Sequence, residues 1–403
     1  MNEAMETLGW DFLFTVFSGQ KVPGEWGRVK VLFIAGHEFL YNPQNGGQKC
    51  SLRNYELLKQ VLGSENVYLC MFSNYSYTKL NNNERIFPTQ KNNVQLFLNT
   101  LTRRNVCDHK TIKRVKKYVQ NLDIDAIFAD SSTIGYLIKT IKCNVPVISF
   151  FHNIEANYAW NKYKHEGKKY IIAYWSYFYN EKCMVQLANQ IILLNKRDEK
   201  ELERLYGRNA DFFLPITFTD TFDEKKIRDE SNKRYELLFV GSLFQPNVEG
   251  LKWFIDKVMQ KLDKKTYFLK IIGKNLETKK IELERENVEV IGTVDNLEEY
   301  YLRADAVVIP IFYGDGMKVK TAEAMMYGKM IFATDEALEG YDINNVEGIY
   351  RCNNAGEFID QLKSTRFKRF NDTVRSIFKN KYDTAIISKD FQGFLTRFIQ
   401  EIN

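Results

Sequence analysis

A short segment between two apolar runs carries glycines and lysines at spacings that suit anion binding. Gly314, Gly316, Lys318, Lys320 and Glu323 all fall within ten consecutive residues. Glycine lets the backbone approach a ligand with no Cβ in the way. A helix expected to begin near residues 319–321 would offer free N–H groups and the positive end of its dipole to an anion. The segment therefore predicts a phosphate-binding turn.

The charged side chains of this turn extend the same prediction. Lys318 and Lys320 add two cations, and each charge-assisted hydrogen bond contributes roughly 1.5–3 kcal/mol. Glu323, in the first turn of the expected helix, can accept hydrogen bonds from a ribose diol. Asp315 stands in the loop eight residues earlier, and Gly328 should end the helix. The alternative is a basic loop that leads into a capped helix and binds nothing.

A second candidate position follows an apolar run at residues 147–151. His152 and Glu155 come directly after it, where doubly wound sheets bind their ligands. A solitary histidine has a structural role as its alternative. Glu155 either orients His152 or caps a helix.

The elements that must position these residues alternate between apolar strands and segments of helical spacing. Strands are predicted at 29–35, 66–70, 126–129, 147–151 and 190–194, and again at 237–240, 268–272, 288–291, 306–310 and 329–334. A polar stretch separates the two sets. We predict an α/β fold with an N-terminal domain at 29–213, a linker at 214–235 and a C-terminal domain at 236–385. A packing helix at 386–403 either stays there or returns to the first domain, and residues 1–28 fit neither domain.

Composition narrows the class of protein. Residues 1–213 hold 28 basic and 20 acidic side chains, and the rest of the chain holds 29 and 31, so the halves carry +8 and −2. The basic run at 103–117 suits an anionic lipid, an anionic acceptor or plain solvent. Six scattered cysteines, no basic leader and no apolar run long enough to span a bilayer predict a reduced, cytoplasmic protein.

Metal and nucleic-acid binding are not expected. The acids of Asp123-Ile124-Asp125 precede a strand, so they should point away from the ligand edge of the sheet. No His/Cys cluster is present in the sequence to hold a metal. The basic run lacks the interleaved aromatic side chains that stack on bases, so no nucleic-acid partner is predicted.

The segment from Pro310 to Ala324 resembles glycosyltransferase family 4. That family often has a proline-ended strand followed by G-x-G-x-[RK]-x-K-x-x-E-A, and the chain reads Gly314-Asp315-Gly316-Met317-Lys318-Val319-Lys320-Thr321-Ala322-Glu323-Ala324. Phe239-Val240-Gly241-Ser242, Ile271-Ile272-Gly273 and Val290-Ile291-Gly292 agree in order. The match is specific over residues 236–340. It is looser over the first domain, at Gly46-Gly47, 152–155 and 193–198.

The resemblance implies a GT-B fold, in which two Rossmann-like domains face each other across a cleft. It also implies a donor site for a nucleotide diphosphate sugar, formed by Gly46, Gly47, Gly241, Gly273, Gly314, Gly316, Met317 and Glu323. Glu323 would bind the ribose, while Lys318 and Lys320 hold the diphosphate. His152 would contact the donor sugar by side chain or main chain, and Gly46-Gly47 would form a flexible loop or a plain turn. Asp315 replaces the glutamate that faces the sugar in many members.

The function expected from this resemblance is retaining hexosyl transfer without a metal or other cofactor. The donor would be a UDP- or GDP-sugar, and the acceptor a glycolipid or polysaccharide hydroxyl at the inner face of the plasma membrane, where the basic half would contact anionic lipid. One alternative is a nucleotide-sugar 2-epimerase of the same fold. Another is a non-catalytic module that binds nucleotide-sugars or polyanions.

Overall fold

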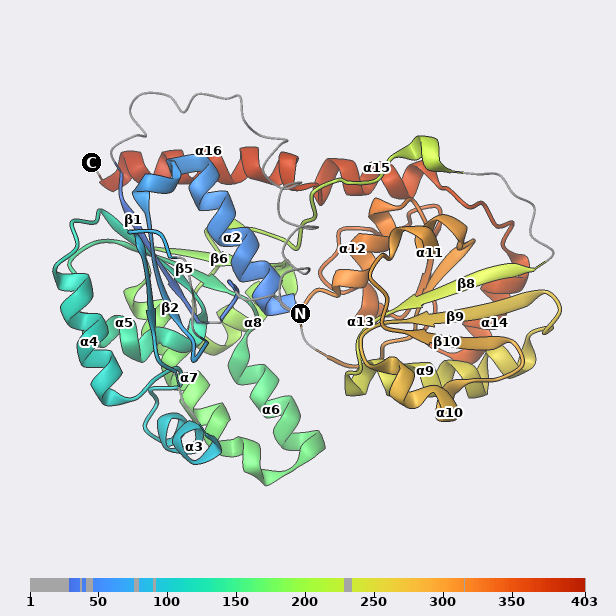
Figure 1. Cartoon of the computed structure of the whole chain (residues 1–403), viewed down its shortest axis with the longest axis horizontal. Helices are drawn as coiled ribbons and strands as arrows, with labels where there is room; N and C mark the ends of the chain where they lie inside the picture. The colour runs from blue at the N-terminus through green and yellow to red at the C-terminus, as the bar shows by residue number, and fades with distance from the viewer. Residues whose placement is uncertain are drawn as a thin grey trace, which may run out of the picture.

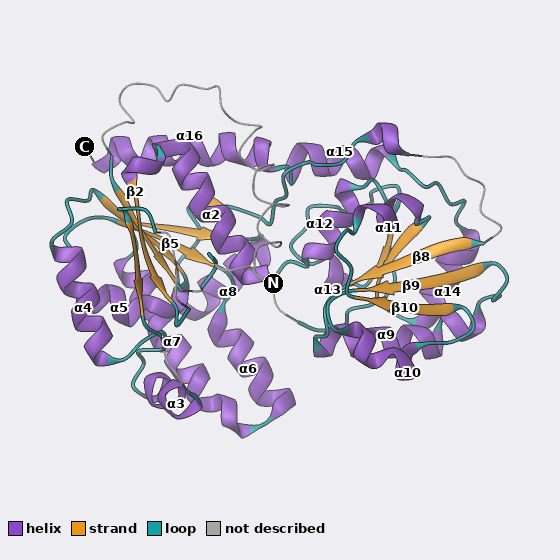
Figure 2. Cartoon of the chain, viewed as in Figure 1, coloured by secondary structure: helices purple, strands orange, loops and turns teal. Residues whose placement is uncertain are grey.

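The computed structural model describes residues 29–36, 38–40, 46–75, 80–89, 92–227, 234–314 and 316–402. Two α/β domains lie side by side, each built on a parallel sheet with helices against it (Figure 1, Figure 2). This arrangement confirms the expected fold class. In the described part of the chain, no helix is long and apolar enough to cross a membrane.

The N-terminal domain has a seven-stranded sheet in the order β3-β2-β1-β4-β5-β6-β7. Its strands are β1 (Val31–Ala35), β2 (Val67–Phe72), β3 (Glu84–Phe87), β4 (Ala126–Asp130), β5 (Val147–Phe151), β6 (Gln190–Leu193) and β7 (Phe212–Phe213). Its helices are α2 (Gly46–Leu62), α3 (Asn93–Leu101), α4 (His109–Gln120), α5 (Gly135–Ile141), α6 (Glu155–Glu166), α7 (Ile171–Leu187) and α8 (Lys196–Tyr206). All pairs are parallel.

The C-terminal domain has a six-stranded sheet in the order β10-β9-β8-β11-β12-β13. Its strands are β8 (Tyr235–Val240), β9 (Tyr267–Ile272), β10 (Val288–Gly292), β11 (Ala306–Ile309), β12 (Met330–Ala333) and β13 (Ile349–Arg351). Its helices are α9 (Gln245–Lys257), α10 (Lys280–Leu283), α11 (Glu298–Arg303), α12 (Val319–Met326), α13 (Asp335–Leu338), α14 (Ala355–Ser364) and α15 (Asp372–Lys381).

Both sheets reverse their strand order at one place, between β1 and β4 in the first domain and between β8 and β11 in the second. Open α/β sheets bind ligands at such a switch point, outside the carboxyl ends of the strands. The central strands are buried on both faces, which requires the near-continuous apolar character seen in β5 and β11. The switch points therefore mark where the site should be sought.

The last helix, α16 (Thr384–Ile402), returns to the N-terminal domain. The ring of Phe391 lies 6.4 Å from that of Phe128 on β4, and the ring of Phe394 stacks 4.8 Å from that of Phe212 on β7. The chain thus crosses between the domains twice. The crossings touch, because the N–H of Phe218 donates to Tyr382 O (3.1 Å) and that of Thr384 to Phe218 O (3.0 Å).

Candidate active site

The predicted phosphate-binding turn lies at the carboxyl end of β11 and leads into α12. Gly314 and Gly316 have φ of 143° and 67°, values that side-chain-bearing residues rarely adopt. Lys318 caps α12 in an extended conformation, and its carbonyl accepts a hydrogen bond from the Tyr341 hydroxyl (2.7 Å). The glycines and the buried tyrosine together orient the first free N–H groups of α12. The expected sugar contact, Asp315, lies outside the described residues, as do residues 1–28.

Lys320, in the first turn of α12, lies between the end of strand β8 and helix α9. Its Nζ donates to Asn247 Oδ1 (2.6 Å) and lies 4.4 Å from the centre of the Phe239 ring. A Cβ on Gly241, at the end of β8, would stand only 2.9 Å from this Nζ. Burial and the neighbouring Lys318 lower the pKa of Lys320 to about 7. The ammonium form is therefore poised to gain from an arriving anion.

Lys318 is already paired in this structure. Its Nζ donates to Glu336 Oε1 (2.6 Å) and to the carbonyl of Gly316 (2.9 Å). The same carboxylate lies 3.9 Å from the guanidinium of Arg197, which comes from the N-terminal domain. Lys318 thus braces the glycine loop against α13, whereas Lys320 points toward the end of β8.

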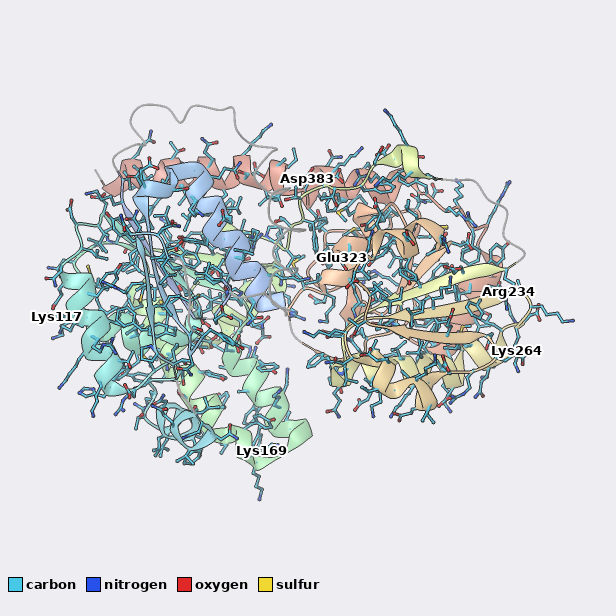
Figure 3. All side chains as sticks on the ribbon, in the orientation of Figure 1. Lys117, Lys169, Arg234, Lys264, Glu323 and Asp383 are labelled. Carbon is cyan, nitrogen blue, oxygen red and sulfur yellow. The ribbon has the colours of Figure 1, made fainter. Side chains whose placement is uncertain are left out.

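Glu323 lies one turn further along α12, on the side of the C-terminal domain that faces the N-terminal domain (Figure 3). The hydroxyl of Tyr301 donates to its Oε2 at 3.4 Å. Burial raises the pKa of Glu323, while the nearby charges of Lys49 and Lys320 act in the opposite direction. Lys49 is part of α2 in the N-terminal domain, so its charge acts on Glu323 from across the interface between the domains.

The structure corrects the expectation for Gly46 and Gly47. They form neither a flexible loop nor a turn, because α2 already begins at Gly46. A Cβ on Gly46 would lie 3.6 Å from Val319 Cγ2, so the first turn of α2 faces the start of α12. The signal that misled was local: the preceding Pro and Asn suggested a turn, but both glycines lie in the first turn of α2.

His152 follows β5 as expected, yet its side chain is directed into the protein. It is 7% exposed, and its Nε2 lies 3.2 Å from Asp130 Oδ2 and 3.4 Å from Ser51 Oγ. Burial alone would lower the pKa of His152, but the Asp130 carboxylate and the Cys50 thiol raise it well above its usual value. The main chain, by contrast, faces the glycine loop.

Helix α6, which follows His152, has its first N–H groups hydrogen-bonded to an acidic side chain on α7. Glu181 on α7 accepts hydrogen bonds from the N–H groups of Glu155 (2.7 Å) and Ala156 (3.2 Å), and from the Tyr206 hydroxyl (2.7 Å). Burial raises the pKa of Glu181 to about 7. Glu155 is the first residue of α6, so its backbone is fixed by this contact, and residues 152–154 are held between β5 and a tethered helix.

The two domains meet directly at the glycine loop. A Cβ on Gly316 would stand 2.6 Å from Asn153 Oδ1 and 3.9 Å from His152 O. Met317 is buried, and a Cβ on Gly340 would lie 2.7 Å from its Cγ and 3.1 Å from Asn195 Nδ2. The anion-binding end of one domain therefore adjoins the switch-point loop of the other.

Gly241 and Gly273 are adjacent at the carboxyl ends of β8 and β9. Gly273 has φ of 152°, and a Cβ there would fall 1.5 Å from Gly241 O. Only glycine permits this approach. The absence of side chains on the two glycines leaves space in the site beside Lys320. A Cβ on Gly241 would fill the space between Lys320 and Asn247.

Several site residues were not identified from the sequence: Lys49, Asn153, Asn247, Tyr301 and Asp130. They lie between 22 and 274 residues from the side chains they act on. Asn153 lies within the looser family match at 152–155, but no role was assigned to it. The others carried no local signal, because each acquires its partner through packing of the sheet or docking of the domains.

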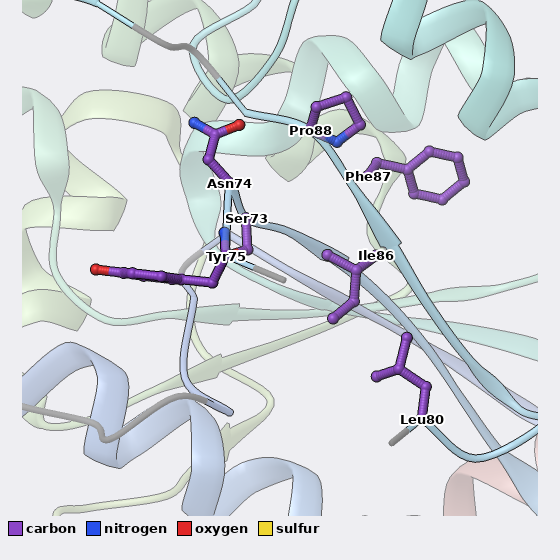
Figure 4. A pocket seen from close by; sticks show the side chains of 7 residues that line it. All are labelled: Ser73, Asn74, Tyr75, Leu80, Ile86, Phe87 and Pro88. Carbon is purple, nitrogen blue, oxygen red and sulfur yellow. The ribbon is translucent and has the colours of Figure 1, made fainter. Parts of the chain in front are cut away.

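An open cavity of about 510 Å³ lies at the carboxyl ends of β2 and β3 in the N-terminal domain. Figure 4 shows its lining side chains, which are Ser73, Asn74, Tyr75, Leu80, Ile86, Phe87 and Pro88. Tyr75 is 57% exposed. The cavity combines an aromatic side chain with hydroxyl and amide groups.

Among the described residues, no three His, Cys, Asp or Glu side chains gather as a metal site. Asp123 and Asp125 lie before β4, where they bind Lys30: its Nζ donates to Asp123 (2.7 Å) and its N–H to Asp125 (2.8 Å). This placement, at the amino end of the strand, agrees with the expectation that the pair faces away from the site.

Comparison with known proteins agrees with this geometry. Residues 234–365 match the family described as glycosyl transferases group 1. An uncharacterized 44.6 kDa protein in the cps region of Klebsiella pneumoniae is 23% identical over 305 residues, which span 68% of this chain and 75% of that protein.

Solved structures are similar over nearly the whole chain. Sucrose-phosphate synthase from Thermosynechococcus elongatus superposes with a TM-score of 0.70 at 15% identity, over 93% of this chain and 100% of that one. Anabaena HepE, solved with UDP and glucose, gives 0.65 at 12% identity, over 91% and 99%. The lipopolysaccharide outer core galactosyltransferase WaaB gives 0.65 at 14%, over 92% and 100%. The chain therefore has the GT-B fold, and its residues 234–365 match the family of glycosyl transferases group 1.

Proposed function

We propose that this protein is a retaining glycosyltransferase of family 4 that transfers a hexose from a nucleotide diphosphate sugar to a hydroxyl of a glycolipid or polysaccharide, without a metal. The observation that carries the proposal is the position of Lys320. Its ammonium sits at the start of α12, beside Gly241 and one turn from Glu323, and Gly316 of the same segment adjoins Asn153 in the loop after β5. Solved relatives of the same fold include HepE in complex with UDP and with UDP-glucose.

The donor would lie along α12. Its diphosphate would accept hydrogen bonds from Lys320 and the first amides of the helix, and its ribose hydroxyls would donate to Glu323. Lys49, projecting from α2, would add a cation from the other domain. Lys318 would act mainly by holding the glycine loop, since its Nζ is bound to Glu336 and Gly316.

The reaction breaks the bond between the sugar's anomeric carbon and the leaving phosphate oxygen. The acceptor hydroxyl oxygen forms its new bond on the same face, and its proton passes to the departing phosphate. Lys320 and the helix amides stabilise the charge that develops on that phosphate. The carbonyl of His152 and the side chain of Asn153 border the position of the sugar, with His152 fixed by Asp130.

The acceptor would enter from the N-terminal domain, where the cavity of Figure 4 offers Tyr75 as a stacking face. The similarity to a protein of a cps region supports a polysaccharide or its lipid-linked precursor as acceptor. An acceptor of this kind places the enzyme at the cytoplasmic face of the membrane.

The proposal is tested by screening the purified protein against UDP-, GDP-, ADP- and TDP-sugars. Thermal stabilisation and slow sugar release should be selective for one donor and should be lost in Lys320→Ala and Glu323→Ala. Release of the donor's 2-epimer in the absence of acceptor would identify an epimerase instead. Stabilisation that both variants retain would mean that nucleotides bind elsewhere.

A further inference from the structure

Helix α3 carries its apolar side outward. Val94, Phe97, Leu98 and Leu101 are spaced i, i+3, i+4 and i+7, so they share one face of the helix. Their exposed fractions are 69%, 51%, 51% and 53%. In a helix packed on its own core this face would be buried, so the amphipathic pattern of α3 is inverted.

The opposite side of α3 carries Asn99, the one buried residue of the helix. Asn99 is 2% exposed, and its carbonyl accepts the N–H of Arg104 (2.8 Å). The following loop is bound by two hydrogen bonds of Asn105, from Asn105 Nδ2 to Thr133 O (3.0 Å) and from Ser176 Oγ to Asn105 Oδ1 (2.7 Å). The loop after α3 is thus tied to Thr133 and to α7, while the apolar face of the helix stays exposed.

Positive charge surrounds this helix. Residues 92–122 contain seven Arg or Lys and a single acid, Asp108, which is used to cap α4. Exposed members of the basic set are Arg103, Lys110, Lys113, Arg114 and Lys117. Lys168 and Lys169 are exposed at the tip between α6 and α7, and Figure 3 shows Lys169 at the same end of the domain as α3 in Figure 1.

We propose that α3 and its basic surroundings dock the protein on an anionic phospholipid surface, with Val94, Phe97, Leu98 and Leu101 inserted among the lipids. An amphipathic helix with basic flanks lies in the plane of the interface, held by apolar burial and by attraction to anionic headgroups. Trp175, 60% exposed on the neighbouring α7, has the amphipathic ring that such interfaces favour.

A second copy of the chain fits this surface less well than a membrane does. A two-fold contact through α3 would set the same basic residues against one another, and like charges across an interface are repulsive. An anionic bilayer satisfies the apolar face and the positive rim at once.

Docking by α3 would also bring the cavity at β2 and β3 close to the membrane. Phe87 and Pro88 line that cavity, and Thr89 Oγ1 bonds Val106 O (2.7 Å) in the loop after α3. A lipid-linked acceptor could then reach the cavity without leaving the bilayer. This step rests on the proposed function, whereas lipid docking itself does not.

The test is cosedimentation with vesicles of phosphatidylglycerol and phosphatidylcholine in equal amounts, at low salt. The double variant Phe97→Ser/Leu101→Ser should bind about tenfold more weakly or worse. Ile281→Ser, which removes a fully exposed isoleucine from α10 of the other domain, should bind like the wild type. Binding should also fall in high salt and in Lys113→Gln/Lys117→Gln.

Wild-type protein that ignores these vesicles, or a double variant that binds them as well as wild type, would overturn the proposal. So would a wild-type dimer that the double variant converts to monomer, because α3 would then be a contact between copies. Binding of a nucleotide-sugar is measured separately. If the wild type and all variants fail to bind a nucleotide-sugar while the wild type still binds vesicles, the proposed function is refuted and the lipid docking stands.

Discussion

The pKa of Lys320 makes donor binding depend on pH in a way that can be measured. Burial holds this pKa at about 7 in the free protein, so the ammonium and amine forms coexist at neutral pH. A diphosphate beside Nζ stabilises the ammonium and raises the pKa in the complex. Binding above pH 7 must therefore take up a proton, and affinity for the donor should fall as pH rises.

The size of the effect follows from linkage. If the pKa in the complex lies well above 8.5, affinity drops roughly fifteenfold between pH 7 and pH 8.5, because an increasing fraction of Lys320 must first be protonated. Lys320→Met also loses a charge-assisted hydrogen bond of roughly 1.5–3 kcal/mol, which lowers affinity roughly ten- to a hundredfold at pH 7. The remaining binding of this variant should be independent of pH.

Titration calorimetry with a nucleotide diphosphate sugar, in buffers of different ionisation enthalpy, measures affinity and proton uptake together. Lys318→Met serves as the matched control, since it removes a cation from the same turn but leaves Lys320 in place. It should weaken binding and keep the proton uptake, but shift that uptake to higher pH, because Lys318 helps to lower the pKa of Lys320. A Lys320→Met protein that binds as tightly as wild type, or that still takes up a proton, would refute the placement of this ammonium against the diphosphate.

Three further variants probe other parts of the site. Glu323→Gln should bind UDP about tenfold more weakly and no longer distinguish it from 2′-deoxy-UDP, as competition binding would show; retained discrimination would exclude Glu323 as the ribose ligand. Asp130→Asn should lower the thermal midpoint most below about pH 6.5. The raised pKa of His152 stabilises the folded protein fully in that range, and this stabilisation is lost as the pH rises through the raised pKa. An equal decrease of the thermal midpoint at all pH values would contradict this. Gly273→Ala should cost about 3 kcal/mol or more in urea unfolding because of its φ and its backbone clash, whereas Gly393→Ala, with open space around its Cβ position, should be neutral or stabilising.

Much of the fold was predictable because the central strands are buried on both faces. Burial demands continuous apolar runs, and β5 and β11 have them. Three of the four edge strands in the described sheets, β3, β7 and β13, were missed for the opposite reason. β3 reads Glu-Arg-Ile-Phe with one buried residue, while β7 has two residues and β13 three, so neither apolar continuity nor length marks them.

The site divides in the same way. Lys320 and Glu323 were identifiable because glycines, cations and an acid stand together along the chain. Asn247 reaches Lys320 only after the C-terminal domain has folded, and Lys49 comes near Glu323 only after the two domains have docked, and no local pattern records either contact. The outward face of α3 was hidden for a different physical reason: helical periodicity shows that one side is apolar, but it does not tell which side meets the core.

The paired crossings between the domains constrain how the enzyme can open. A single flexible linker would let one domain swivel in any direction about the other. Here the segment after β7 and the segment before α16 are hydrogen-bonded to each other through Phe218, Tyr382 and Thr384. Such a coupled pair resists twisting and sliding, so the remaining freedom is mostly a swing about one line. Such a swing would separate the start of α12 from the loop after β5, and its reversal would bring them together again.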